Sequence, residues 1–339
     1  MSSIQAKHLI VGGGLLGLSI ADHLLRRGAE GVMVLEQRSS PASGRAGGIA
    51  PALATGQEAY HPLESRARLL LEEWESYLEI DPCYHRCGSV LVPCPDPLPP
   101  GGEHLDRDGV ARRVPGLALA DGCDAAFQGE DGLLDTTALL SALHWQVRKR
   151  GGNLFFHCQV QLLEEEEQGI AFSAPPRGGI AQRVYLAAGV DNLRLLRGLG
   201  ADPPVAMIAR HHFLFDAPAG GFSLVRLDGD EAVLLDSGEG QWLLQLAAEP
   251  DLHHREPVVD WRLLEEFRRQ RRELLPGLGG ARIRRGSAEN LLALDPDPPG
   301  IHTAAAGRIL AAGAFDLYGV LLALALGERM AEEGLADPR

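Results

Sequence analysis

Residues 8–17 read HLIVGGGLLG, and residues 15–27, which overlap them, read LLGLSIADHLLRR. The first stretch begins as a short apolar strand, and the second has apolar residues at helical spacing. The glycines between them have the spacing GxGxxG: Gly12 permits a tight turn, Gly14 lets a ligand approach the backbone, and Gly17 lets the helix pack closely on the strand. The helix N-terminus adds free N–H groups and partial positive charge. This pattern predicts the start of a Rossmann-like domain that binds the pyrophosphate of a dinucleotide.

An acidic residue follows at the distance typical of such a domain. The apolar segment Val32 to Leu35 predicts a second strand, which ends at Glu36. A carboxylate at this point can accept both hydroxyls of an adenosine ribose, and it would repel the 2′-phosphate of NADP. The predicted cofactor site also includes the residues beside these two motifs: Leu15, Leu16, Gln37 and Arg38.

The next segment distinguishes between dinucleotides. Residues 39–51 read SSPASGRAGGIAP, which is small, polar and glycine-rich where a plain NAD domain usually begins its next regular element. With this loop and the N-terminal motif, the sequence resembles the superfamily of D-amino acid oxidase and glycine oxidase, which includes sarcosine oxidase relatives. The resemblance implies FAD, bound non-covalently because residues 313–319 contain no cysteine. It places along the ribityl chain and the isoalloxazine ring the residues Ser43, Gly44, Arg45, Ala46, Gly47, Gly48 and Ile49.

The order of the other predicted elements fits the same superfamily over nearly the whole chain. Helices are predicted at Leu63–Leu78 and Thr136–Arg150, and a strand at Asn153–Leu163. Short alternating strands follow after residue 201, with an amphipathic helix at Val259–Leu275. We therefore expect an α/β fold, α+β overall. It combines a discontinuous Rossmann-like FAD-binding domain (residues 1–80, 131–200 and 286–339) with an inserted antiparallel-sheet substrate domain (residues 81–130 and 201–285).

The C-terminal part predicts a second contact with the cofactor. A strand at Arg308–Ala312 leads through a glycine-containing turn into an apolar helix that starts at Val320. In the superfamily resembled, the matching helix start faces the flavin, where its dipole favours the reduced ring. The resemblance thus adds Gly313, Tyr318, Gly319 and Val320 to the cofactor site, and it places near FAD the residues Val160, Ala188 and Gly189.

The resemblance implies oxidation of a small amine or amino acid, with a hydride passing from the carbon next to nitrogen to flavin N5 and the imine then hydrolysed. By the same resemblance Arg284 would clamp a substrate carboxylate, while Asp316 and Tyr318 lie in the loop nearest the expected ring. His211 and His212 are neighbours on a predicted strand, so at most one faces the cavity, and His212 is included as a substrate contact. No residue is identified as a certain catalytic group. Because several superfamily motifs are altered here, glycine itself does not follow as the substrate.

Two other functions stay open. One is an FAD-dependent 2-hydroxy-acid or polyol-phosphate dehydrogenase on the same fold, and the other is a non-catalytic flavin-binding subunit. The electron acceptor is oxygen or another carrier, and a homo-oligomer is compatible with the sequence.

Composition excludes several other classes. The formal net charge of −14 disfavours nucleic acid and anionic membranes as partners. No apolar run is long enough for a membrane span, and five cysteines without a secretory leader indicate a cytoplasmic protein without a disulfide framework. No metal site is expected, because no second ligand pair follows Cys83 and Cys87. The acidic run Glu164–Glu167 predicts a solvated hairpin or loop.

Overall fold

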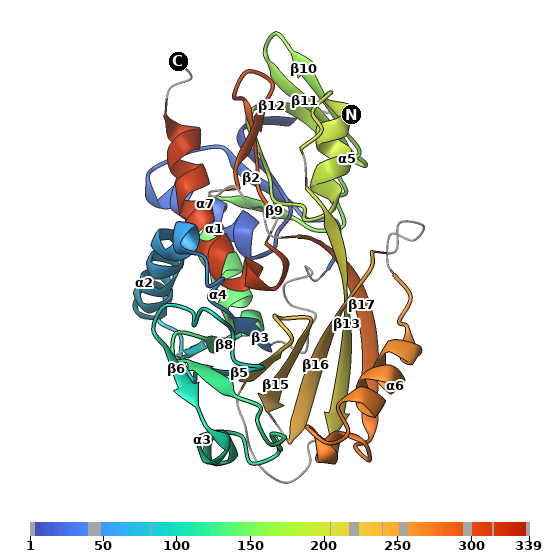
Figure 1. The fold of residues 1–339 in the computed structure, drawn as a ribbon. Helices are drawn as coiled ribbons and strands as arrows, with labels where there is room; N and C mark the ends of the chain where they lie inside the picture. Colours follow the sequence, from blue (N-terminus) through green and yellow to red (C-terminus); the bar gives the residue numbers. More distant parts are fainter. Residues whose placement is uncertain are drawn as a thin grey trace.

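A computed structural model describes residues 4–39, 49–81, 83–203, 205–216, 224–238, 240–250, 257–293, 300–313 and 315–336. The chain forms two large mixed sheets and one small sheet, with helices packed on both large sheets (Figure 1). This arrangement confirms the expected α/β fold class.

The first large sheet has the strand order β10-β11-β12-β1-β2-β9. In addition, β19 pairs with β12, and β18 pairs with β19. β1 pairs in parallel with β2 and β12, as a dinucleotide-binding sheet requires, whereas β10, β11 and β18 pair antiparallel. The strands are β1 (Ile4–Val11), β2 (Val32–Leu35), β9 (Asn153–Phe155), β10 (Leu162–Glu166), β11 (Gly169–Ala174), β12 (Arg177–Leu186), β18 (His302–Ala304) and β19 (Ile309–Ala311).

Helices cover this sheet on both faces. Because side chains alternate along a strand, Ile10 of β1 packs with the helices of one face, and Leu9 and Val11 pack with the other. The first face carries α1 (Leu15–Arg26), α2 (His61–Leu78), α4 (Thr136–Lys149) and α7 (Gly319–Leu335), and α5 (Asp191–Gly198) lies opposite (Figure 1). Asp135 caps α4 by accepting a hydrogen bond from Ala138 N, as its sequence position predicts.

The second large sheet has the order β17-β13-β16-β15-β14-β5-β7-β6. One face packs on α3 (Arg107–Arg113) and α6 (Trp261–Gln270), and the other faces the first sheet through residues such as Leu214 and Leu243, which pack with Leu53 and Leu317. The strands are β5 (Ser89–Val92), β6 (Gly102–Leu105), β7 (Ala125–Gln128), β13 (Met207–Asp216), β14 (Leu224–Leu227), β15 (Ala232–Gly238), β16 (Gln241–Ala248) and β17 (Ile283–Leu292).

The small sheet lies between these two layers (Figure 1). Its central strand β8 (Gly132–Asp135) pairs antiparallel with β3 (Ile49–Ala52) and β4 (Tyr84–His85). Three short 3-10 helices complete the regular structure of the described residues: η2 (Glu58–Tyr60), η3 (Pro276–Leu278) and η4 (Asp316–Tyr318).

Two predicted elements are wrong in extent. The strand predicted at 153–163 is two strands, since β9 pairs with β2 and β10 pairs with β11, and the chain turns between them where His157 has a left-handed φ of 56°. The helix predicted from Val259 starts at Trp261, because the Asp260 side chain caps it, and it ends at Gln270.

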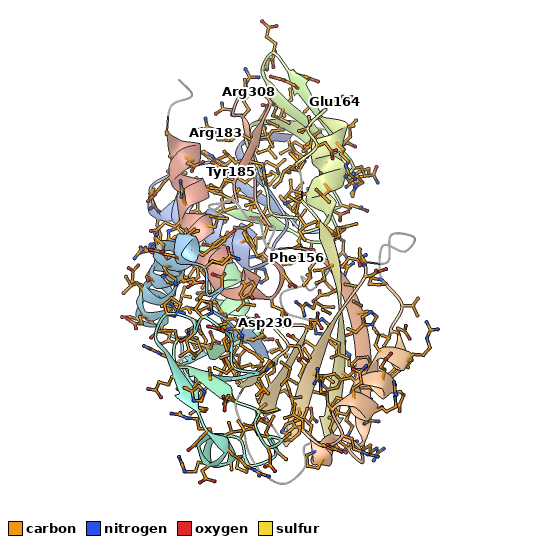
Figure 2. All side chains as sticks on the ribbon, viewed as in Figure 1. Phe156, Glu164, Arg183, Tyr185, Asp230 and Arg308 are labelled. Atoms are coloured by element: carbon orange, nitrogen blue, oxygen red, sulfur yellow. The ribbon has the colours of Figure 1, made fainter. Side chains whose placement is uncertain are left out.

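The acidic run has the predicted form. Glu164–Glu166 lie on the β10–β11 hairpin, and all four glutamates are exposed, as Figure 2 shows for Glu164. The domain division stays a prediction; β17 pairs with β13 on both sides of the boundary expected at residue 286. Among the described helices, none has the length and apolarity to cross a membrane.

Candidate active site

One cavity of about 300 Å³ lies where the two large sheets face each other. Its lining comes from both sheets and from the start of α7. One end contains the glycine turn and Glu36, and the other contains side chains of β13, β16 and β17. We call these the dinucleotide end and the substrate end.

The glycine turn at the dinucleotide end has no room for side chains. Gly12 has a φ of 107°, and a Cβ at this residue would lie 2.3 Å from the carbonyl oxygen of Ala187. A Cβ at Gly17 would lie 1.9 Å from the carbonyl oxygen of Gly12. The turn therefore requires glycine for its own close packing. Within the described residues, the start of α1 has no side-chain cap, and Gly12, Gly14 and Leu15 line the cavity there. This cradle of backbone at a helix N-terminus fits a diphosphate.

Glu36 is held in place beside this cradle by the backbone. One carboxylate oxygen accepts a hydrogen bond from Gly13 N at 2.7 Å, and the other accepts one from Arg38 N at 2.9 Å. The side chain is buried yet lines the cavity. Because a carboxylate has about four acceptor sites, it keeps capacity for ribose hydroxyls.

The other residues predicted to contact the cofactor fall into three groups: those that line the cavity, those that do not, and those outside the described part of the chain. Those that line the cavity with Gly12, Gly14 and Glu36 are Leu15, Leu16, Gln37, Arg38, Val160, Ala188, Gly189, Gly313, Gly319 and Val320. Gly17, Ile49 and Tyr318 do not line it. The remaining predicted contacts, Ser43, Gly44, Arg45, Ala46, Gly47 and Gly48, lie outside the described residues.

The sequence did not indicate one basic residue of the dinucleotide end. Arg194 of α5 lines the cavity and donates hydrogen bonds to the carbonyl oxygens of Val160 and Gln161, each at 2.8 Å. Arg194 therefore fixes the segment that carries Val160. Its only sequence signal is its place in the helix after Gly189.

Helix α7 begins at the cavity. Gly319 and Val320 line it, and the first turn of α7 has no acidic residue. The partial positive charge of this helix N-terminus therefore meets no acidic side chain within the helix's own first turn, and it favours negative charge on a group bound there.

His212 of β13 is the central side chain of the substrate end. Its Nε2 lies 3.1 Å from Glu289 Oε1 of β17, and Gln245 lies directly opposite it on β16. All three residues line the cavity. His211 points to the other face of the sheet, where its Nδ1 accepts a hydrogen bond from Asp260 N at 3.2 Å. The alternation expected for this histidine pair is therefore present, whereas no sequence motif indicated Gln245 or Glu289.

Asp316 and Tyr318, both predicted substrate contacts, are separated by the turn that carries them. Asp316 lines the cavity, and its carboxylate accepts two hydrogen bonds from buried Arg210, at 2.9 and 2.5 Å. The Tyr318 hydroxyl instead donates to Asp230 at 2.5 Å, outside the lining. Burial is the largest cause that raises the pKa of Tyr318, so this hydroxyl stays protonated and donates.

Behind this turn lies a buried ion network that sequence reasoning missed. Arg226 donates two hydrogen bonds to Asp230, both at 2.6 Å, and one to Asp131 at 2.8 Å. Burial alone would raise the pKa of Asp230, but the hydrogen bonds and charge of Arg226 outweigh it and lower the pKa. Figure 2 shows Asp230 between the two sheets. Arg226 and Asp230 are four residues apart, but Asp131 reaches them only through folding, so no sequence spacing indicates the whole network.

Arg284 lies outside the cavity. Its Nε donates to Asp216 at 2.6 Å, and 46% of its side chain is exposed. We therefore assign it no substrate contact.

The sequence profile of the DAO family of FAD-dependent oxidoreductases matches residues 7–333. The chain belongs to this family. It is an FAD-dependent oxidoreductase, and FAD is the cofactor that the cradle and Glu36 fit.

Two curated proteins are similar to this member of the DAO family. Glycine oxidase of Bacillus licheniformis is 23% identical over 97% of this chain and 93% of its own length. One of the subunits of opine oxidase from Rhizobium meliloti is 32% identical over 106 residues, which are 31% of this chain and 28% of that protein.

Solved structures share the fold. NikD, described as an unusual amino acid oxidase essential for nikkomycin biosynthesis, has a TM-score of 0.83 at 19% identity and covers 100% of this chain and 95% of its own. L-proline dehydrogenase of P. horikoshii also has a TM-score of 0.83, at 17% identity over 99% of this chain and 96% of its own.

Proposed function

We propose that this enzyme oxidises the C–N bond of a small amine or amino acid. The observation that supports this proposal is a single cavity that joins a dinucleotide cradle to a polar patch on an antiparallel sheet. A substrate held at that patch lies at the flavin end of the cofactor. The curated and structural relatives named above include a glycine oxidase and an amino acid oxidase.

Bound FAD supplies the hydride acceptor for the carbon next to nitrogen, and the protein positions the substrate. His212 and Gln245 are suited to this positioning, because both are buried, lie opposite each other on β13 and β16, and line the cavity. Nε2 of His212 donates to the Glu289 carboxylate, which fixes the orientation of the ring. Phe315 and Leu317 give the cavity apolar lining that limits water around the reacting carbon, and water then hydrolyses the imine.

An anaerobic titration of the purified flavoprotein tests the proposal. Glycine, D-amino acids, N-alkylglycines, plain amines and 2-hydroxy acids are added separately, and the visible flavin absorbance is recorded. Bleaching by a compound with a C–N bond is the expected result. Bleaching by 2-hydroxy acids alone would indicate the dehydrogenase alternative, and no bleaching by any amine would overturn the proposal. Admission of oxygen afterwards shows whether oxygen is the acceptor.

The local similarity to one chain of opine oxidase, a protein named as a subunit, favours a second candidate: a flavin-binding chain that requires a partner. Turnover by the purified chain alone distinguishes the two. A chain that binds FAD but reduces it only when a partner protein is added would support this second candidate.

A further inference from the structure

We infer that the substrate end of the cavity binds an amine that carries a second, cationic group, in preference to a substrate carboxylate. This inference rests on the proposed function, because it names the substrate class of the same site. It is carried by the acceptor atoms of His212 and Gln245 and by the charge of Glu289.

Two buried acceptors at this end have no protein partner among the described residues: Nδ1 of His212 and Oε1 of Gln245. Their residues are only 6% and 3% exposed. A carboxylate only accepts hydrogen bonds, so Glu289 fixes the proton of neutral His212 on Nε2 and leaves Nδ1 as an acceptor. Buried polar atoms are nearly always satisfied, and these two therefore point to a ligand that donates hydrogen bonds.

The strand register brings these acceptors together. His212 and Gln245 are paired directly across β13 and β16, and Glu289 lies diagonally from His212 on β17, opposite Arg210. Directly paired residues share a sheet face, and so do residues two apart on one strand. The three groups thus form one patch on rigid strands, and a ligand meets them together.

The fixed charges at this end favour a cation. Arg210 and Asp316 neutralise each other, and Glu289 adds a further negative charge. The two arginines of the described lining, Arg38 and Arg194, belong to the dinucleotide end, where Arg38 N bonds Glu36 and Arg194 bonds Val160. Neither arginine of the described lining therefore offsets the charge of Glu289 at the substrate end.

A carboxylate and an ammonium would interact with this patch in opposite ways. A carboxylate would face the like charge of Glu289 and the acceptor atoms His212 Nδ1 and Gln245 Oε1, and burying an unpaired charge is strongly unfavourable. An ammonium can donate to these two acceptors. The Glu289 carboxylate, which lies on the Nε2 side of the His212 ring, favours the positive charge without contacting it directly. The reacting amine is held separately, over the flavin.

Binding of three matched ligands to the FAD-loaded enzyme tests the inference without requiring turnover. Putrescine, butylamine and 4-aminobutanoate share one amine and differ at the far end, which is an ammonium, a methyl group or a carboxylate. Their dissociation constants are measured by perturbation of the flavin spectrum under anaerobic conditions and by calorimetry. We expect putrescine to bind at least tenfold more tightly than 4-aminobutanoate, with butylamine between them.

Variants assign this preference to the patch. Glu289→Gln is expected to reduce putrescine binding about tenfold, and Glu289→Lys to reverse the order of putrescine and 4-aminobutanoate. The matched control Glu164→Gln removes the same charge from the exposed hairpin far from the cavity and should leave all three constants unchanged. If the Glu289 variants lose FAD, Gln245→Leu provides a second test, because it changes no charge. It should weaken the binding of putrescine several-fold and leave the dissociation constant of butylamine unchanged.

Each outcome bears on one proposal. Tighter binding of 4-aminobutanoate by the wild type, or no binding of putrescine, would overturn the inference. A putrescine preference that survives both Glu289→Gln and Gln245→Leu would also overturn it, since the patch would not be its source. The enzyme could also bind putrescine preferentially while no amine bleaches the flavin. That result would support the inference about the site and contradict the proposed function.

Discussion

At the scale of single residues, backbone contacts decide what Glu36 and the glycines do. The Glu36 carboxylate ties the turn at Gly13 to the end of β2 through two backbone hydrogen bonds. Charge-assisted hydrogen bonds of this kind contribute about 1.5–3 kcal/mol each. The residue therefore has two roles, because it orders the cradle and offers acceptors to the ribose.

Glu36→Gln is expected to weaken FAD binding by about ten- to a hundredfold, because it removes the charge that holds Gly13 N and Arg38 N. The dissociation constant of FAD for the apoprotein, measured by fluorescence quenching, checks this. Glu30→Gln is the control, since Glu30 is an exposed partner of Lys7. Equal FAD affinity in wild type and Glu36→Gln would contradict the proposed ribose contact.

A second residue connects pH with stability. Burial lowers the pKa of His23 to about 3, although the opposing charge of Glu328 favours the protonated ring. The unfolded chain therefore binds this proton below about pH 6.5 while the folded chain does not, and stability falls as the pH drops from 6.5 toward 3, by about 1.4 kcal/mol per unit.

Replacement of His23 by phenylalanine should remove this part of the acid sensitivity. Between pH 7.5 and 4.5, the free energy of unfolding of the wild type should fall by about 2–3 kcal/mol more than that of the variant. Urea titrations at the two pH values provide the comparison. Parallel losses in both proteins would show that His23 is protonated while folded.

At the scale of elements, helices α1 and α7 approach each other closely enough to exclude a side chain. A Cβ at Gly327 of α7 would lie 2.3 Å from Ser19 Oγ and 3.0 Å from Ile20 N of α1. Ser19 Oγ also donates to the Leu324 carbonyl oxygen at 2.8 Å. Both helices begin at the cavity, where Leu15 of α1 and Val320 of α7 line it, so their packing sets the distance between these two parts of the lining.

Gly327→Ala should lower the free energy of unfolding by about 1–3 kcal/mol, because the added methyl group overpacks the helix contact. Gly198→Ala in α5 is the matched control: nothing lies within 4 Å of the new Cβ, and a neutral or slightly stabilising effect is expected. Thermal unfolding of both variants, with FAD content recorded, gives the answer. An unchanged or higher melting temperature for Gly327→Ala would contradict this prediction, because it would show that the contact between α1 and α7 accommodates the methyl group without loss of stability.

Elements also show where local sequence is insufficient. β2 has the predicted bounds, because it is an uninterrupted apolar run. The division of 153–163 into β9 and β10 depends on which neighbour each half pairs with, and these neighbours, β2 and β11, lie in different parts of the sheet.

At the scale of the whole molecule, the network around Arg226 joins the second large sheet, the small sheet and the turn before α7. Arg226 of β14 holds Asp131, which precedes β8, and Asp131 also accepts hydrogen bonds from Ala54 N and Ser89 Oγ. Tyr318, one residue before α7, reaches the same network through Asp230. The second large sheet and the start of α7 are therefore positioned by one set of buried charges.

Arg226→Met should destabilise the protein by about 3–5 kcal/mol, because two buried carboxylates lose their cation. Tyr318→Phe removes one hydrogen bond and should cost about 1 kcal/mol. Chemical unfolding followed by flavin fluorescence and by circular dichroism measures both. If Arg226→Met costs no more than Tyr318→Phe, the network is not a main source of stability between the sheets.

The dinucleotide turn, Glu36, the family resemblance and the order of most elements could be predicted from the amino-acid sequence, because these depend on neighbours along the chain: strand, turn and helix are adjacent. The opposite orientation of His211 and His212 could also be predicted from the sequence, whereas only the folded chain shows that His212 is the one that lines the cavity. The substrate end required the folded chain, since Gln245 and Glu289 reach His212 through strand register, and Arg284, which the resemblance favoured, lies on the exposed end of β17. Burial also matters, because folding removes water from Nδ1 of His212 and Oε1 of Gln245 and leaves them without a hydrogen-bond partner in the described protein. Such a lack of partners cannot be recognised from the sequence.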